Sequence, residues 1–156
     1  GISVVTQPES RWERVDIKTT GLLPNVLAKM NAKSQGAKEA WFVDRDGFIT
    51  EGGSSNAWIV TADSRLVTRP AESGILRGIT RTTLLDLAAE EGLTVEERPF
   101  RVAEAKAARE AFVTSATNIV MPVVRIDGSP VGDGKPGALV PRLRARFHDI
   151  AEWRSI

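Results

Sequence analysis

Residues 14–25 read Arg14-Val15-Asp16-Ile17-Lys18-Thr19-Thr20-Gly21-Leu22-Leu23-Pro24-Asn25. Apolar and polar residues alternate up to Lys18, which predicts a strand, and the following residues predict a break and the start of a helix. Lys18 is therefore expected where a strand gives way to a turn. A partly desolvated lysine near other cations has a lowered pKa, and its free amine can attack an aldehyde to form a Schiff base. Since the chain has 21 lysines and arginines, Lys18 could equally be a solvated surface charge.

The composition indicates one ordinary globular domain. With 156 residues, of which 42% are hydrophobic and 26% charged, the chain can bury one core. A net charge of +1 without a basic run favours small-molecule partners over nucleic acid or acidic membranes. The absence of cysteine excludes disulfides and thiolate zinc sites, and the lone His148 excludes a histidine-rich metal site. No apolar run has the length of a membrane span and no signal peptide is visible, so a soluble, cytoplasmic protein is expected.

The hydrophobic pattern predicts a single α+β domain over residues 1–156. Its sheet is expected to be bent and mostly antiparallel, or a pseudo-barrel, flanked by helices. The chain begins without an initiator methionine and apparently inside a strand, which is consistent with a fragment. Further strands are expected over 39–43, 48–51, 57–60, 66–67, 95–100, 111–114 and 119–126, and helices over 23–36, 78–92, 103–108 and from 139 onward. In the first helix, apolar Leu23, Val26, Leu27 and Met30 fall at helical spacing and are expected to pack on the sheet.

Glu51 is the second candidate for chemistry. It ends a predicted strand directly before Gly52 and Gly53, so its carboxylate could lie on a pocket floor where a flat ligand approaches the backbone closely. A carboxylate in that position can keep a heterocyclic nitrogen protonated, and in pyridoxal phosphate this preserves the ring as an electron sink. An exposed strand-end glutamate would have the same sequence signature.

Two further segments suit a phosphate group. The run Leu76-Arg77-Gly78-Ile79-Thr80-Arg81 opens a predicted helix, whose first amides and glycine allow a phosphate to approach closely, with the Thr80 hydroxyl as a further donor. An ordinary glycine turn with Thr80 as the helix cap is compatible with the same residues. The run Thr114-Ser115-Ala116-Thr117-Asn118 ends a predicted strand and could place donors around the same phosphate, although a plain polar loop would look identical.

Together and in this order, the motifs resemble those of the class IV (fold type IV) aminotransferases. The resemblance covers the chain from about Trp12 to the C-terminus and is most similar to D-amino acid aminotransferases. Branched-chain aminotransferases usually have Gly-Thr in place of Thr114-Ser115-Ala116. The four motifs that carry the resemblance are Asp16-Ile17-Lys18, Thr50-Glu51-Gly52 with Ser54-Ser55-Asn56, the run from Leu76 to Arg81, and Phe112-Val113-Thr114-Ser115-Ala116-Thr117.

The resemblance implies the large-domain fold of these enzymes, pyridoxal 5'-phosphate as the cofactor, and a role for each site residue. Lys18 would carry the cofactor as a Schiff base and move a proton between the substrate α-carbon and the cofactor. Glu51 would bind the pyridine nitrogen, and Asn56 would fix the loop that bears Glu51. Leu76 would pack on the ring. The residues expected around the phosphate are Gly78, Ile79, Thr80, Ser115 and Ala116.

The implied activity is reversible amino transfer between a D-amino acid, such as D-alanine, and a 2-oxo acid, by a ping-pong mechanism. Branched-chain L-amino acid aminotransferase and aminodeoxychorismate lyase share the cofactor site and remain alternatives, as do a noncatalytic half-domain that binds a cofactor or partner and a plain structural domain. Family members are longer, with a smaller N-terminal domain that supplies a phosphate-binding arginine and much of the substrate-carboxylate pocket. That domain is absent from this chain, so a separate N-terminal fragment or domain is expected as a partner, together with a homodimer.

Overall fold

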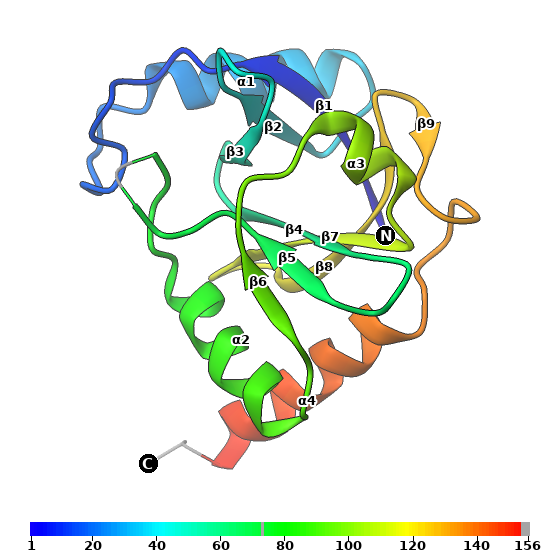
Figure 1. The fold of residues 1–156 in the computed structure, drawn as a ribbon. Helices are drawn as coiled ribbons and strands as arrows, with labels where there is room; N and C mark the ends of the chain where they lie inside the picture. Colours follow the sequence, from blue (N-terminus) through cyan, green and yellow to red (C-terminus); the bar gives the residue numbers. More distant parts are fainter. Residues whose placement is uncertain (73, 154–156) are drawn as a thin grey trace.

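The computed structural model describes residues 1–72 and 74–153 (Figure 1). The strands are β1 (Ile2–Pro8), β2 (Glu39–Val43), β3 (Ile49–Gly52), β4 (Asn56–Val60), β5 (Leu66–Thr68), β6 (Val95–Glu97), β7 (Glu110–Ser115), β8 (Ile119–Ile126) and β9 (Ser129–Pro130). The helices are α1 (Leu23–Ser34), α2 (Ile79–Glu90), α3 (Val102–Ala107) and α4 (Leu139–Trp153). Among the described helices, none is both long and apolar enough to cross a bilayer.

The strands form one curled, mixed sheet in the order β3-β2-β1-β8-β7-β4-β5-β6, with β9 added beside β8. Most pairings are antiparallel, and the parallel ones are β1–β2, β1–β8 and β5–β6. The two ends of this order come together, because the Ile49 amide donates to the Phe100 carbonyl at 3.0 Å and Phe48 bridges Arg101. The prediction of a bent, mostly antiparallel sheet or pseudo-barrel flanked by helices is confirmed.

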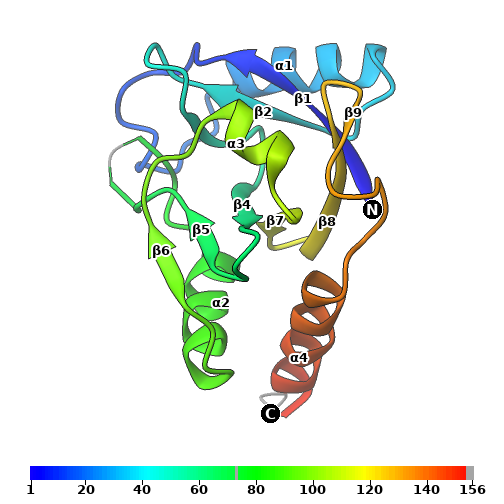
Figure 2. The same cartoon turned by 45° about the vertical axis from the view of Figure 1, so that its right-hand side comes forward.

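Alternation along the strands divides the apolar residues among three clusters. On β4, Ile59 packs inside the curl of the sheet, whereas Trp58 packs against α2 and α4 on the outer side. On β2, Trp41 belongs to the inner cluster, whereas Phe42 packs under α1. Figure 2 shows the result, with α1 over one end of the sheet and α2 and α4 over the other. The curled sheet is thus covered on its outside by helices and filled on its inside by side chains.

The strand predicted up to Lys18 is wrong. Residues 9–22 form a loop between β1 and α1, with a turn in which the Ile17 amide donates to the Arg14 carbonyl at 3.1 Å. The Arg14 guanidinium also grips the Asp16 carboxylate at 2.8 and 2.9 Å, which folds the alternating residues onto themselves. Because β1 already occupies the sheet position beside β2, the alternation in this segment has no neighbouring strand to pair with.

Helix α1 has the predicted limits but buries a different face. Its apolar stripe is exposed, at 66% for Leu23, 57% for Leu27 and 64% for Met30. Ala28 and Ala32 are buried instead, and their small side chains let the helix lie close to β1 and β2. Asn25 and Lys29, on the same side as Ala28, bond to residues 53 and 54. The expectation that the larger apolar stripe packs on the sheet of this chain is therefore wrong.

Candidate functional site

Glu51 is the centre of a buried polar cluster. Its side chain is 6% exposed at the end of β3, where three donors from different segments reach it. Arg11 Nη1 lies 2.6 Å from Oε1, Asn56 Nδ2 lies 2.9 Å from Oε2, and the Leu76 amide lies 3.2 Å from both oxygens. An ionised carboxylate offers about four lone-pair directions, and these three donors make four contacts with its two oxygens. The alternative of an exposed strand-end glutamate is excluded.

The turn after Glu51 is fixed by close packing and by a second buried acid. A Cβ at Gly52 would lie 2.2 Å from Ser55 Oγ, so only glycine fits at that position. The Glu39 carboxylate accepts hydrogen bonds from the Ser54 amide and from the hydroxyls of Ser54 and Ser55, at 3.0 to 3.2 Å. This network holds β3 and β4 in place, and it delivers Asn56 at the start of β4 to Glu51.

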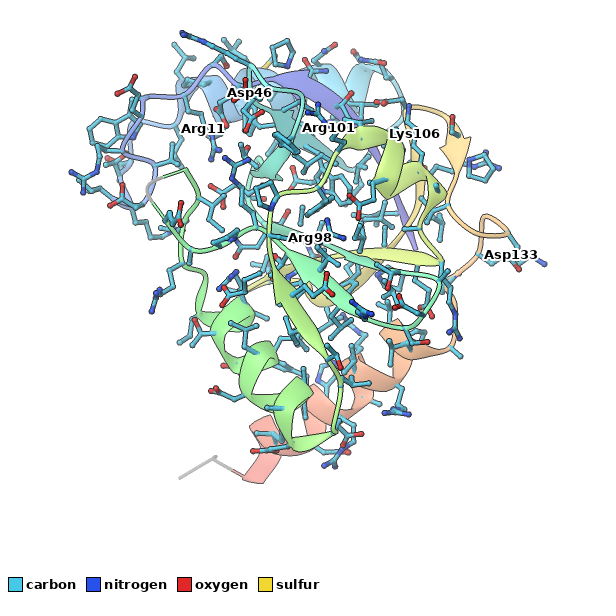
Figure 3. The ribbon with its side chains drawn as sticks, viewed as in Figure 1. Arg11, Asp46, Arg98, Arg101, Lys106 and Asp133 are labelled. Carbon is cyan, nitrogen blue, oxygen red and sulfur yellow. The ribbon has the colours of Figure 1, made fainter. Side chains whose placement is uncertain are left out.

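Arg11 is the residue that the sequence reasoning missed. Its guanidinium donates from Nε and Nη2 to the two oxygens of Glu9, at 2.9 and 2.7 Å, and from Nη1 to Glu51. The guanidinium carbon also lies 4.5 Å from the centroid of the Phe42 ring. Figure 3 shows Arg11 reaching from the loop after β1 toward the sheet. A loop residue is not part of a hydrophobic pattern, so the sequence gives no sign that Arg11 is buried. Its contact with Glu51 is seen only in the structure.

The charged groups in this cluster shift one another's pKa values. Burial raises the pKa of Glu51 to about 7, against the opposing effect of the Arg11 charge and hydrogen bonds. Burial also acts to raise the pKa of Glu9, but its hydrogen bonds and ion pair with Arg11 outweigh that effect and leave the pKa below the usual value. Glu9 is thus a stable anion at neutral pH, while Glu51 titrates near neutrality.

The two segments predicted to hold a phosphate lie at the same end of the sheet as Glu51. Asn56 Nδ2 also donates to the Leu76 carbonyl at 2.8 Å, which ties the segment before α2 to β4. Asn56 is paired with Thr114 on β7, so Ser115 and Ala116 follow directly beside it. Figures 1 and 2 both show the segment before α2 beside the loop of residues 9–22. The structure therefore brings Glu51, Asn56, Leu76 and the 114–116 segment together.

Gly78, Ile79 and Thr80 begin α2. Gly78 is the residue before the helix, and a Cβ there would lie 2.3 Å from Asn56 Oδ1. Thr80 is buried within the first turn, so it is not the helix cap, and Ile79 is 74% exposed. The first amides of a helix have no intrahelical acceptor, which is the arrangement that binds anions.

Lys18 lies in the exposed loop of residues 9–22. The expected desolvation of Lys18 is absent in this chain. The loop is nevertheless anchored to the site, because Arg11 near its start contacts Glu51 and because α1 at its end bonds to residues 53 and 54.

The residues present fit pyridoxal phosphate. A buried carboxylate suits a protonated ring nitrogen, and the start of α2, where a Cβ at Gly78 would meet the Asn56 amide, suits a phosphate. Among the described residues, no cluster of three or more histidines and acids is placed to hold a metal ion. A shallow hollow of about 300 Å³ lies elsewhere, lined by Thr6, Gln7, Pro8, Val43, Asp44 and Val102, and contains none of the predicted site residues.

Comparisons with known proteins show the family of the chain. The family model described as amino-transferase class IV matches residues 1–126. The D-alanine aminotransferase of Bacillus licheniformis is 42% identical, over 96% of this chain and 52% of its own, and that of Staphylococcus aureus strain COL is 40% identical, over 100% and 55%. The chain thus spans about half the length of the curated relatives it matches.

Solved structures of aminotransferases also match this chain over about half of their own length. The branched-chain amino acid aminotransferase of Thermobaculum terrenum, in its PLP form, superposes with a TM-score of 0.87 at 30% identity, covering 99% of this chain and 52% of that one. The branched-chain aminotransferase of Thermoproteus uzoniensis with norvaline superposes with a TM-score of 0.85 at 29% identity, covering 96% and 51%. The sheet and helices described above are therefore those of a known fold.

Proposed function

We propose that this chain, which belongs to the class IV aminotransferase family, is the pyridoxal-phosphate-binding domain, residues 1–156, of an enzyme that transfers an amino group between a D-amino acid and a 2-oxo acid. The observation that carries the proposal is the buried Glu51 carboxylate, held by three donors at the end of the sheet where α2 begins. A surface acid would not need three donors from three segments. A site for a protonated heterocycle does, because the acid must be charged while it is buried.

Each residue has a proposed task. Pyridoxal phosphate, when bound, supplies an aldehyde carbon and a ring that withdraws electrons from the substrate α-carbon. Lys18 Nζ would hold the cofactor through its aldehyde carbon, with loss of water, and the same amine would move a proton at the substrate α-carbon. Glu51 holds a proton on the ring nitrogen, Asn56 fixes Glu51, and Leu76 packs on the ring. The phosphate is bound by the backbone at Gly78, Ile79 and Ala116 and by the hydroxyls of Thr80 and Ser115.

The exposure of Lys18 supports a site completed by other parts of an assembly. Schiff-base chemistry favours a lysine that is shielded from water, so we expect another part of an assembly to pack over the loop of residues 9–22. We propose an N-terminal domain or fragment as one cover and a second copy of this chain as another. The exposed apolar stripe on α1, formed by Leu23, Val26, Leu27 and Met30, directly follows this loop and is proposed as the homodimer contact. The cysteine-free composition is in keeping with the cytoplasm as the compartment.

D-alanine is the proposed donor substrate. The support is the identity of 39 to 42% to D-alanine aminotransferases across nearly the whole chain, against 29 to 30% to the branched-chain enzymes described above. Activity with an L-branched-chain amino acid, or release of pyruvate from aminodeoxychorismate, would assign the chain to the alternative enzymes. Product assays with D-alanine and L-leucine, each with a 2-oxo acid acceptor, separate these functions.

The first test is borohydride reduction of the chain with pyridoxal phosphate, followed by peptide mass spectrometry. A pyridoxyl adduct confined to Lys18 is expected, and it should be lost in Lys18→Ala but kept in Lys33→Ala, which changes an exposed lysine of α1. An adduct without turnover, even when an N-terminal half is supplied, would indicate a cofactor-binding half-domain. No adduct under either condition would refute the cofactor assignment.

A further inference from the structure

We propose that Arg11 is a positioning residue, oriented by Glu9, that favours the ionised form of the Glu51 carboxylate and fixes its place in the site for contact with a cationic ring nitrogen. The first part concerns this chain alone, whereas the last part rests on the proposed function. Arg11 and Glu9 belong to none of the four motifs and lie at the start of the loop between β1 and α1.

The geometry of Arg11 is that of an anchored group. Its side chain is 6% exposed, its guanidinium stacks over Phe42, and its Nε and Nη2 form a fork to both oxygens of Glu9. Glu9 is itself held, because its carboxylate also accepts from the Arg11 amide at 3.0 Å and from the Thr50 hydroxyl at 2.9 Å. The fork fixes the guanidinium plane and leaves Nη1 for Glu51 at 2.6 Å.

The charges of the three residues account for the arrangement. With all three ionised, the cluster has a net charge of −1, so a cationic ring nitrogen beside Glu51 makes it neutral. With Glu51 protonated, the cluster is already neutral and has no net charge to attract a cation. Removing Arg11 leaves Glu9 and Glu51 as two buried or half-buried anions close together. Their repulsion is removed when Glu51 takes up a proton, so its pKa is expected to rise.

The other neighbours of Glu51 cannot replace Arg11. Asn56 donates through an uncharged amide, and the Leu76 contact is a backbone amide at 3.2 Å from each oxygen. The charged groups that act on Glu51 are Arg11, which favours the ionised form, and Glu9, which opposes it. A lysine at position 11 would keep a charge but would lose the planar fork, since an ammonium cannot grip Glu9 and Glu51 in the same geometry.

The test follows the ionisation of Glu51 itself. In the chain labelled with ¹³C-glutamate, the Glu51 carboxyl signal, assigned with Glu51→Gln, is titrated without cofactor. Arg11→Met is expected to raise the proton affinity of Glu51 by about tenfold or more, which is one pH unit or more in the titration midpoint. Arg11→Lys keeps a cation at this position and serves as the second variant if Arg11→Met does not fold. It is expected to give a smaller rise. Arg98→Met is the matched control, because Arg98 also grips two glutamates, Glu96 and Glu104, but outside this cluster.

A second readout is the yield of the borohydride-trapped adduct at Lys18 against pyridoxal phosphate concentration. We expect half-saturation at about tenfold higher concentration in Arg11→Met and no change in Arg98→Met. An unchanged Glu51 midpoint in both Arg11 variants would overturn the proposal. A shifted midpoint combined with no adduct in the parent chain would leave the effect of Arg11 on Glu51 standing and would refute the proposed function instead.

Discussion

A carboxylate as buried as Glu51 makes the stability of the cofactor-free chain depend on pH. Its pKa is about 7 when folded and near 4.5 when unfolded, so between these values the folded state binds more protons than the unfolded state. The free energy of unfolding is therefore expected to fall by about 3 kcal/mol from this group as the pH rises from 4.5 to above 7. Urea titrations from pH 4.5 to 8 measure it. Glu51→Gln should remove most of this fall, and an equal fall in that variant would assign it to other groups.

The acids whose pKa values are lowered act outside this window. The pKa values of Glu9, Asp44 and Asp127 lie below those of ordinary acids. Burial acts to raise each pKa, but hydrogen bonds and nearby cations lower it by more. Their stabilising effect is present at neutral pH and is lost only as the pH falls through those lowered values. The slope between pH 4.5 and 7 is thus expected to be that of Glu51.

Gly78 offers a second test at the level of a single residue. A Cβ at this position would lie 2.3 Å from Asn56 Oδ1, so Gly78→Ala must displace the amide that bonds to both Glu51 and the Leu76 carbonyl. The expected cost is about 1 to 3 kcal/mol in the free energy of unfolding, together with weaker trapping of the cofactor at Lys18. Gly21→Ala, where a Cβ meets nothing within 4 Å, should be close to neutral. Equal effects of the two substitutions would show that Asn56 does not constrain position 78.

At the scale of elements, α1 shows what sequence periodicity can and cannot predict. The spacing of Leu23, Leu27 and Met30 predicted the helix, and its limits are confirmed. The same spacing did not identify the face buried on the sheet, because the polar bonds of Asn25 and Lys29 to residues 53 and 54 fix the rotation of the helix. A hydrophobic period indicates that a helix has an apolar face, but it does not identify what packs against that face.

The exposed stripe of α1 leads to a prediction about assembly. Leu27→Glu places a charge in the proposed homodimer contact while keeping a good helix former at a residue that is 57% exposed. The dimer dissociation constant, measured by sedimentation velocity, should rise by about tenfold or more, with the free energy of unfolding of the separated chain changed by less than about 0.5 kcal/mol. Gln35→Glu, at the end of the same helix, adds the same charge outside the stripe and should leave association unchanged. A parent chain that stays monomeric at all concentrations would exclude the stripe as a homodimer contact.

Strands and turns were predicted better than the segment that bears Lys18. The hairpin of β2 and β3, the start of α2 after Gly78 and the end of β7 within one residue of position 114 all follow from local signals, which is why Glu51 and its neighbours could be placed in the fold. The alternation before Lys18 resembled a strand, but the Arg14–Asp16 ion pair and the position already taken by β1 decided otherwise. Arg11 was missed because its importance depends on contacts 40 residues away along the chain.

At the scale of the whole molecule, the chain spans about half the length of the curated relatives it matches. Glu51, the start of α2 and the 114–116 segment lie at one end of the curled sheet, whereas Lys18, in the loop of residues 9–22, is exposed. We therefore expect the chain to trap the cofactor weakly by itself and to transaminate only when complemented. Mixing it with the N-terminal half of the Bacillus licheniformis enzyme, which this chain matches over 52% of that enzyme's length, should raise pyruvate formation from D-alanine and 2-oxoglutarate by about a hundredfold over either half.

The physical reason is orientation. A substrate held by the cofactor site alone can rotate, whereas a second domain that binds its carboxylate fixes the α-carbon at the proton carrier, and small misplacements are costly to rate. Lys18→Ala should abolish the complemented activity, because no amine remains to bond the cofactor or to carry the proton. Lys33→Ala should retain it. Robust turnover by the chain alone would mean that these residues already make a complete site, and complemented activity with L-leucine rather than D-alanine would reassign the substrate to the branched-chain class.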